Sequence, residues 1–424
     1  MLKKVILLFI VSINTLFAID ATMEITKQKS TLPTVSVVIS SDTNIKSNIS
    51  QKISALVVKD LLVSGHFNHS EVIIENKYDM VPKYKLLKQN GIDLYLLMQI
   101  KKTDLNGLIV NAKLYDINTN SLVLNKSYST SNKTRYPFLS HKVAIDINDY
   151  LDAPSIKWMD KFVIFSRYLN AKQSEIVVSD YTLTYQKIVV KGGLNIFPKW
   201  ASKKQENFYY TTYKYEQPTL IKQNLFTKQT ERLLSSDGML ICSDVSKNGD
   251  KLVLTMAPNS QPDIYVYDVK SKLKTRITKY NGIDVGGNFV DNDKKIVFVS
   301  DRLKYPNIFA KKIGEKGVER LIYHGKNNSQ CTTFDNYIVY SSRETDNEFN
   351  ANSFNLYLIS TNSDYVRRLT TNGRNQFPKF SSDGQSILYI KNDSKNSYLG
   401  IIRVSYNKSF LFALKTGKLQ SIDW

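Results

Sequence analysis

The sequence predicts a small α/β domain followed by an all-β six-bladed β-propeller closed by the C-terminal strand. The main observation is a strand-like run centred on Tyr265, which recurs at steps of 44, 44, 44, 48 and 44 residues. Repeats in the mid-forties that contain several short strands and turns are typical of propeller blades. Six copies therefore predict six blades. The run centres are Val177, Ile221, Tyr265, Phe309, Tyr357 and Ile401.

Two further landmarks stay in phase with this repeat. One is an Arg followed by Leu or Ile, and the other is a bulky residue before a polar turn. The single step of 48 coincides with extra residues at 348–351, which predict a longer hairpin loop. Because one blade cannot bury both faces of its sheet, consecutive blades must stack into a ring. The arginines are Arg232, Arg276, Arg320 and Arg368, and the bulky residues are Trp200, Val245, Phe289, Phe334 and Phe380.

The start of the chain has the pattern of a secretory signal. Lys3 and Lys4 precede an apolar run, and Ala18 is a small residue at a suitable cleavage point. This pattern predicts a signal peptide at residues 1–18. The apolar run is too short for a spanning helix, and no later stretch is longer, so we expect no transmembrane segment after the signal is removed.

Residues 19–153 are expected to form the α/β domain, which begins with a short polar arm. Ile49, Ile53, Val57 and Leu61 fall at helical spacing, and Gly65 is a natural stop for that helix. Pro154 marks the join to the next domain. The other expected elements are strands at 35–39, 72–74, 92–100, 108–117 and 122–128, a short helix at 84–88 and a helix at 136–151.

Residues 154–424 are expected to form the propeller, which starts with a strand at 162–166. The bulky landmark at Phe380 recurs 44 residues later as Trp424, the last residue of the sequence. The strand at 419–424 therefore has no blade after it. We expect this strand to dock into the first blade and close the ring, because an open ring would leave two unpaired sheet edges.

Charge and cysteine content limit the function classes. The formal net charge is +20, but the lysines are dispersed, which does not favour nucleic-acid binding. Cys242 and Cys331 each lie three residues before a landmark, so they occupy equivalent places in non-adjacent blades. A disulfide needs Cα atoms within about 7 Å. Free thiols are therefore expected.

No catalytic or metal-binding pattern stands out. The chain has no Gly-x-Ser-x-Gly motif. His66 and His69 lie at the end of a predicted helix and are interpreted as surface residues rather than metal ligands. Asp291 and Asp293 are interpreted as a solvated turn rather than a cation site. We expect no catalytic residue, no metal and no cofactor. His141 and His324 are isolated in the sequence.

The loops that lead into the innermost strands should rim the central channel. They mix apolar, amide and glycine residues, as in Val285, Gly286 and Gln376. This mixture suits binding of a protein or peptide better than turnover of a small molecule.

Several motifs, in matching order, resemble the TolB family, the periplasmic component of the Tol-Pal system. The resemblance covers essentially the whole chain after the signal. It departs at the end, where the family's usual Phe-Pro-x-Trp is replaced by SIDW at 421–424. The motifs are DLLVSGHF at 60–67, GID at 91–93, KLYD at 113–116, EIVVSDY at 175–181, FPKW at 197–200, IYVYD at 264–268, FVSDR at 298–302 and FPKF at 377–380.

The resemblance implies a non-enzymatic periplasmic adaptor. Its propeller would bind Pal, the peptidoglycan-associated lipoprotein, and its N-terminal segment would bind TolA, the inner-membrane arm. Other outer-membrane proteins are further partners, and nucleic acid is not. Such a protein supports outer-membrane invagination during cell division and envelope integrity. By position, the Pal-facing rim is Met239, Leu240, Cys242, Asp284, Val285, Gly286, Gln330, Asn375 and Gln376, and the TolA-facing arm is Ile19, Asp20, Met23, Glu24 and Ile25.

One alternative is open at this point. A periplasmic propeller enzyme, a glycan hydrolase or lyase, would place its site in the channel. It would need carboxylates that converge there with shifted pKa values, whereas an adaptor would present a mixed apolar rim.

Overall fold

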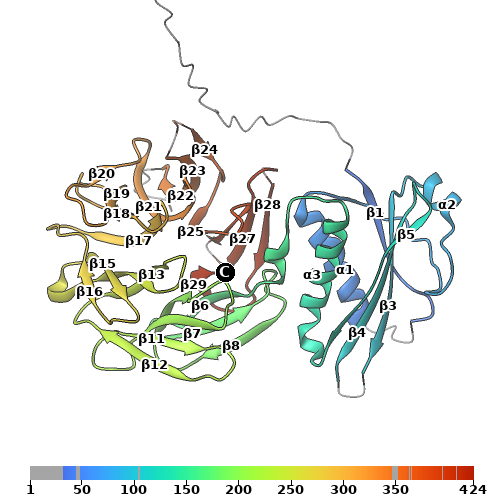
Figure 1. Cartoon of the computed structure of the whole chain (residues 1–424), viewed down its shortest axis with the longest axis horizontal. Coiled ribbons are helices and arrows are strands. Elements are labelled where there is room, and N and C mark those ends of the chain that lie inside the picture. Colours follow the sequence, from blue (N-terminus) through green and yellow to red (C-terminus); the bar gives the residue numbers. More distant parts are fainter. Residues whose placement is uncertain are drawn as a thin grey trace, which may run out of the picture. The chain divides into compact units, whose positions relative to one another are not determined.

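The computed structural model describes residues 32–43, 48–103, 106–345, 352–361, 363, 365–393, 395–406 and 408–424 (Figure 1). The signal peptide and the arm predicted from the sequence lie outside these residues. Within the described ranges, no helix combines the length and the apolar character needed to cross a membrane.

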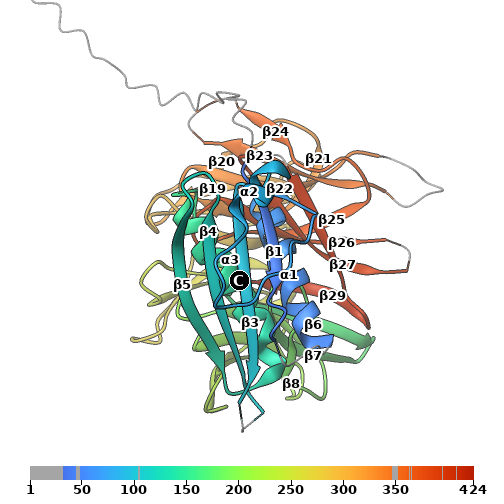
Figure 2. The ribbon, with the colours of Figure 1, turned by 90° about the vertical axis from the view of Figure 1, so that its right-hand side faces the viewer.

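The first domain contains a five-stranded mixed sheet in the order β2-β1-β3-β4-β5. Strand β1 runs parallel to β2 and β3, while β3, β4 and β5 form an antiparallel meander (Figure 2). Helices α1 and α3 pack on one face through residues such as Ile53, Val57 and Val143, and Leu87 of α2 packs on the other. The elements are β1 (Thr34–Ile39), α1 (Asn48–Ser64), β2 (Asn68–His69), α2 (Tyr84–Gln89), β3 (Leu94–Lys102), β4 (Leu108–Asp116), β5 (Ser121–Thr130), η1 (Lys133–Arg135) and α3 (Tyr136–Tyr150).

The predicted strand at 72–74 is wrong. These residues have no regular structure, and Ile73 is 69% exposed. Strand β1 pairs with only two residues of β2, Asn68 and His69. The hydroxyl of Ser36 then donates to the carbonyl of Val72 at 3.1 Å. The apolar run at 72–74 thus leaves the sheet edge, although its β-branched residues favour a strand locally.

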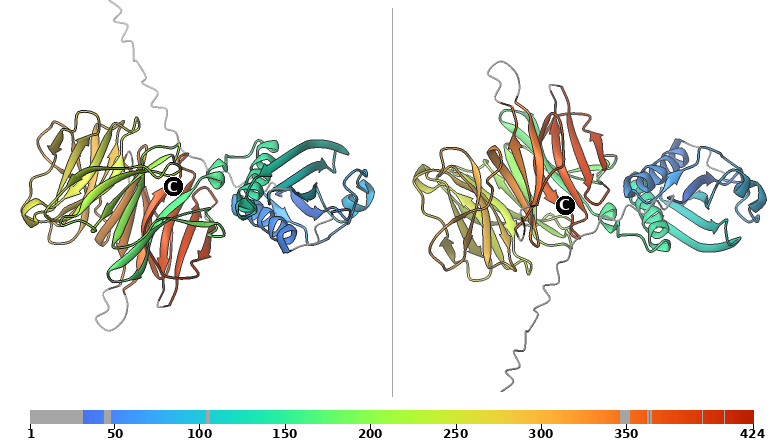
Figure 3. Two further views of the ribbon diagram at one scale, coloured as in Figure 1. Left: turned by 90° about the horizontal axis from the view of Figure 1, so that it is seen from below. Right: turned by 90° about the horizontal axis from the view of Figure 1, so that it is seen from above.

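The second domain confirms the predicted propeller. The described strands form six four-stranded blades, and a single parallel bridge between Phe354 and Arg374 joins the last two. Figure 3 shows the stacked blades, green through yellow to red in chain order, from two opposite sides. The innermost strands are β29 (Lys418–Asp423) of blade 1, β9 (Asn195–Trp200) of blade 2, β13 (Leu240–Val245) of blade 3, β17 (Asp284–Val290) of blade 4, β21 (Lys326–Phe334) of blade 5 and β25 (Arg374–Phe380) of blade 6.

The remaining strands are β6 (Val163–Asn170), β7 (Gln173–Ser179), β8 (Gln186–Val190), β10 (Asn207–Thr212), β11 (Thr219–Asn224), β12 (Thr230–Ser235), β14 (Lys251–Met256), β15 (Asp263–Asp268), β16 (Lys274–Arg276), β18 (Lys295–Ser300), β19 (Asn307–Lys312), β20 (Glu319–Arg320), β22 (Tyr337–Arg343), β23 (Phe354–Ser360), β24 (Val366–Arg368), β26 (Ser386–Asn392), β27 (Ser397–Arg403) and β28 (Lys408–Ala413). Short 3-10 helices occur at η2 (Lys157–Asp160) and η3 (Pro258–Ser260).

The C-terminal strand closes the ring as predicted. Strand β29 pairs antiparallel with β6 from Lys418 opposite Tyr168 to Asp423 opposite Ile164 (Figure 1). The indole nitrogen of Trp424 donates to the carbonyl of Phe380 at 2.8 Å. This contact ties the end of the chain to the innermost strand of blade 6, so closure couples the first and last blades.

A buried ion cluster joins the α/β domain to blade 1. The His141 ring, from α3, contacts Asp60 of α1 through Nδ1 at 2.7 Å and Asp180, just after β7, through Nε2 at 3.3 Å. The Tyr181 hydroxyl donates to the other oxygen of Asp60. All four side chains are fully buried. Burial acts to lower the pKa of His141, but the two carboxylates raise it to about 10.

Two histidines therefore differ from their interpretation in the sequence. His141 is isolated in the sequence but central to this cluster, because its partners are distant in the chain and meet only in the fold. His66 is buried rather than on the surface: its Nδ1 contacts the Asn148 amide oxygen at 2.5 Å and its ring meets Tyr406 edge-on. Burial lowers the pKa of His66. Among the described residues, no group of acidic, histidine or cysteine side chains has a metal-binding arrangement.

Cys242 and Cys331 are both free and buried, which confirms the expectation of free thiols. Burial raises the pKa of Cys331 to about 12 and raises the pKa of Cys242 as well. At pH 8, a pKa of 12 lowers the thiolate fraction of Cys331 roughly a thousandfold relative to an ordinary thiol.

We therefore expect both cysteines to react with a thiol reagent such as DTNB only after denaturation. Kinetics in native buffer and in 6 M guanidinium chloride would check this. Rapid stoichiometric labelling of the native protein would contradict the buried placement of the two thiols.

Candidate functional site: the propeller channel

Each innermost strand carries a β-bulge midway along its length. The pairing register shifts at this point in β9, β13, β17, β21, β25 and β29. In four of these strands a residue at the bulge has a positive φ, and the residues are Phe197, Gly286, Gln330 and Phe377. A bulge bends its strand and redirects the following side chains.

Of the predicted rim residues, five are accessible. Met239 is 42% exposed, and Val285, Gly286, Gln330 and Gln376 are half-buried. The Gly286 N–H donates to the Thr255 hydroxyl at 3.0 Å, and the Phe377 N–H donates to the Gln330 side-chain oxygen at 3.1 Å. These contacts hold neighbouring blades together at the rim.

The other four predicted rim residues are buried. Leu240 and Cys242 belong to the hydrophobic core of blade 3. The Asp284 carboxylate accepts two bonds from Arg302, at 2.9 and 2.8 Å, and the Asn375 amide donates to the carbonyl of Asn372 at 2.8 Å. These buried side chains support the rim residues and present no surface to a partner. The buried and accessible residues alternate along each strand, so that Asp284 and Asn375 are covered while the adjacent Val285 and Gln376 are accessible.

The channel interior contains a charged chain that the sequence did not reveal. The Lys199 ammonium lies 3.0 Å from Asp423 and 3.3 Å from Asp244. These carboxylates also accept the backbone N–H groups of Trp200 and Phe289, at 2.8 and 2.9 Å. Although burial acts to lower it, the carboxylates of Asp423 and Asp244 hold the pKa of Lys199 above its ordinary value.

The charged chain links blades 1 to 4, because Lys199 of blade 2 contacts Asp423 of blade 1 and Asp244 of blade 3, and Asp244 accepts the Phe289 N–H of blade 4. Each charged residue of the chain immediately precedes a bulky landmark residue. Lys379 occupies the same position in blade 6, and burial together with the charge of Lys199 lowers its pKa. In the sequence, a charged residue directly before several of the bulky landmarks is the signal that could have identified this charged chain. The carboxylates of the charged chain contact Lys199 and accept backbone N–H groups, so the chain stabilises the contacts between neighbouring blades.

A large recess of the propeller lies at the mouth formed by the ends of the innermost strands. It has a volume of about 1170 Å³ and is lined by landmark residues such as Trp200, Phe289, Phe334 and Trp424. The predicted rim is formed by the beginnings of the same strands. The two mouths of the channel are therefore different surfaces: aromatic landmark residues line the recess at one, and apolar and amide side chains lie at the other.

Asp291 and Asp293 lie in the β17–β18 turn beside this recess. Asp291, Asn292 and Asp293 all have positive φ values. Asp293 accepts the Lys247 N–H at 3.0 Å, and the Lys247 ammonium donates to the Asn292 side chain at 2.8 Å. The interpretation as a turn therefore agrees with the local contacts.

The fold and the channel define a class of two-domain proteins, in which an α/β domain precedes a closed six-bladed propeller. Family models agree in both parts: "TolB amino-terminal domain" matches residues 21–123 and "TolB beta propeller domain" matches residues 161–424. The chain is 46% identical to the Tol-Pal system protein TolB of Wolinella succinogenes, over 99% of this chain and 100% of that protein. It is 43% identical to the same protein of Helicobacter pylori strain HPAG1, over 98% and 99%.

The chain therefore belongs to the TolB family. Among solved structures, TolB from Acinetobacter baumannii matches with a TM-score of 0.75 at 21% identity, covering 92% of this chain and 96% of that one. At that identity the match supports the fold.

Proposed function

We propose that this protein is a periplasmic, non-enzymatic adaptor of a Tol-Pal system, which binds a Pal-type peptidoglycan-associated lipoprotein through the propeller rim. The observation that carries the proposal is the full-length relationship to proteins named for that system. The accessible rim adds physical support, since the exposed Met239 and the half-buried Val285 provide apolar groups on the same rim as the amides of Gln330 and Gln376. Interfaces of this kind combine a few apolar anchors with polar surroundings.

The second partner is a TolA-type inner-membrane protein, bound by the arm. Its candidate contacts are Ile19, Asp20, Met23, Glu24 and Ile25, which lie outside the described residues. A short polar segment can order when it binds and so couple binding to a switch. Through its two partners the adaptor would link the inner membrane to outer-membrane invagination at division.

The substitution Val285→Arg tests the rim. A long charged side chain there should block close packing and weaken binding of the purified lipoprotein by roughly tenfold or more, as measured by isothermal titration calorimetry. Leu273→Arg is a matched control, because Leu273 is 64% exposed in the β15–β16 turn, away from the rim. Equal loss in both variants, or none in Val285→Arg, would show that the contact lies elsewhere.

Deleting residues 19–25 from the exported protein tests the arm separately. Binding of the inner-membrane partner should disappear while binding of the lipoprotein persists. If the lipoprotein does not bind even the unaltered protein, the adaptor proposal fails, and release of soluble fragments from peptidoglycan would then test the enzyme alternative.

A further inference from the structure

Blade 4 contains a guanidinium that is built into the fold. Arg302, which follows β18, donates to the Asp284 carboxylate at 2.9 and 2.8 Å and to the Ser300 hydroxyl at 2.8 Å. The same guanidinium lies over aromatic rings, 4.7 Å from the centroid of Tyr280 and 5.3 Å from that of Phe309. Acceptors at one edge and aromatic faces beside the plane are the environment that a guanidinium prefers.

Blade 5 repeats this environment without its cation. The cross-strand pair Asp284–Ser300 of blade 4 corresponds to Asn328–Ser342 of blade 5. The aromatic pair Phe298–Phe309 corresponds to Tyr340–Tyr357, and Tyr280 corresponds to His324, 44 residues later. Two residues beyond the serine, where blade 4 has Arg302, blade 5 has Glu344.

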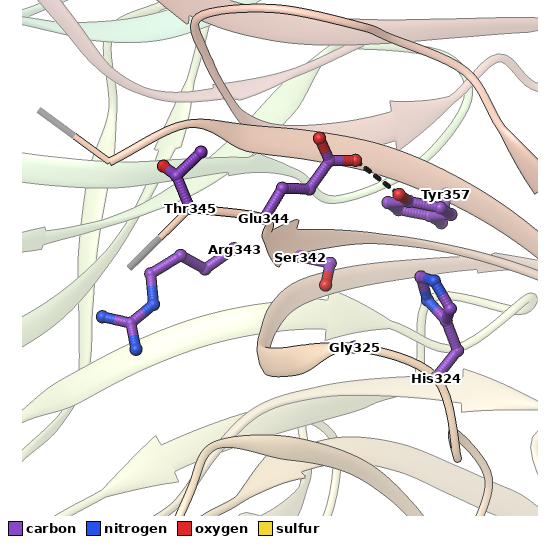
Figure 4. A pocket seen from close by; sticks show the side chains of 7 residues that line it. All are labelled: His324, Gly325, Ser342, Arg343, Glu344, Thr345 and Tyr357. Atoms are coloured by element: carbon purple, nitrogen blue, oxygen red, sulfur yellow. Dashed lines mark hydrogen bonds between the residues drawn. The ribbon is translucent and has the colours of Figure 1, made fainter. Parts of the chain in front are cut away.

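Glu344 does not occupy the position of the missing guanidinium. Its carboxylate accepts hydrogen bonds from the Tyr357 hydroxyl, from the Asn355 amide at 2.6 Å and from Arg368. Figure 4 shows Glu344 directed toward Tyr357, while the Arg343 side chain points away from the other lining residues. Blade 5 therefore keeps the serine and the aromatic rings of the blade 4 site, has Asn328 in place of the Asp284 carboxylate, and has no arginine at the position of Arg302.

Two buried polar atoms at this place have no hydrogen-bond partner. Among the described residues, the Ser342 hydroxyl and the Asn328 side-chain oxygen make no hydrogen bond, although Ser342 is 1% and Asn328 0% exposed. A Cβ atom on Gly325 would lie 2.5 Å from the Ser342 hydroxyl and 3.1 Å from the Asn328 oxygen. Both atoms thus lie close to Gly325, where a side chain would not fit without a shift, and unsatisfied buried acceptors of this kind call for a donor.

A cavity of about 400 Å³ lies at this place, lined by residues that include His324, Gly325, Ser342, Glu344 and Tyr357 (Figure 4). We propose that this blade 5 cavity binds a guanidinium group, supplied by an arginine side chain of a partner protein. The guanidinium would donate to Ser342 and Asn328, lie beside the rings of Tyr357 and His324, and receive its counter-charge from Glu344. Blade 4 provides the template for this arrangement within the same chain.

The direct test is a titration of the full chain with N-acetyl-L-arginine amide, followed by NMR or calorimetry. We expect saturable binding that is at least roughly tenfold tighter than that of the N-acetyl-L-citrulline amide, which has the same shape without the charge, and of the N-acetyl-L-lysine amide, which has the charge without the planar fork. Equal binding of the arginine and citrulline compounds would overturn the proposal.

Two variants locate the site. Glu344→Arg supplies the residue that blade 4 uses, so the chain should fill its own cavity and lose binding of the arginine compound. Ser342→Val removes one acceptor and should weaken binding about tenfold. Glu315→Arg makes the same charge change at an exposed position and should bind like the unaltered protein. Retained binding in both Glu344→Arg and Ser342→Val would overturn the assignment, and circular dichroism confirms that each variant is folded.

Free L-arginine distinguishes the source of the group. Its charged amino and carboxyl groups are absent from an arginine within a protein chain, so it should bind no more tightly than the blocked amide. Tighter binding of free L-arginine would indicate a small-molecule site and overturn the part of the proposal that names a protein partner.

Discussion

Deletion of residues 418–424 is expected to abolish the stable propeller, or to lower its melting temperature by more than about 10 °C. The deleted segment is the innermost strand of blade 1. It contains Leu419 and Ile422, which are almost fully buried, and Trp424, whose ring packs against Trp158 with centroids 5.3 Å apart. Burial of Leu419 and Ile422 alone contributes roughly 3–6 kcal/mol, a large part of the usual stability of about 5–15 kcal/mol.

The deletion also leaves the inner edge of β6 unpaired, because β29 is its partner on that side. Calorimetry or circular dichroism melting would measure the effect. A point variant separates closure from chain length: Leu419→Asp should be severely destabilising, whereas Lys418→Asp, at an exposed position on the same strand, should change the melting temperature little. An unchanged melting temperature in the deleted chain would mean that the ring does not depend on this strand.

Replacement of His141 by Ala is the second change with a large expected effect. It would leave the buried carboxylates of Asp60 and Asp180 without their shared cation. Breaking a buried ion pair by removing one partner typically costs about 3–5 kcal/mol. Denaturant unfolding would measure the loss in free energy of unfolding. His69→Ala is a suitable control, because His69 is only partly buried. A loss below about 1 kcal/mol in His141→Ala would show that the cluster does not stabilise the protein.

The same cluster predicts a pH dependence of stability. The folded pKa of His141 is about 10, above its ordinary value of 6.5, because Asp60 and Asp180 favour the charged ring. A group with a raised folded pKa contributes fully below its unfolded pKa and loses its contribution as the pH rises through the folded value. The free energy of unfolding should therefore fall between about pH 6.5 and 10, with a limiting slope of about 1.4 kcal/mol per pH unit. His141→Ala should flatten this slope.

Local patterns predicted the elements that depend on periodicity. The helical spacing of Ile49, Ile53, Val57 and Leu61 corresponds to α1, and the spacing of 44 residues from Phe380 to Trp424 predicted the closing strand. Both succeed because burial of a helix face or of a strand face imposes its period on the sequence itself. The run at 72–74 failed because nothing in its sequence shows that β1 pairs with only two residues of β2.

The sequence by itself determined the number of blades, the closure of the ring and the free state of the two thiols, because a repeated unit carries its own packing requirements in each copy. Only the tertiary structure decided which rim residues are accessible, since Leu240, Cys242, Asp284 and Asn375 are covered by residues that lie further along the chain or in the neighbouring blade. It also decided the partners of His141 and Lys199 and left the Ser342 hydroxyl without one. Those contacts depend on residues that are distant in the chain. A local sequence pattern does not show which distant side chain provides the opposite charge or the hydrogen-bond donor, or whether one is present.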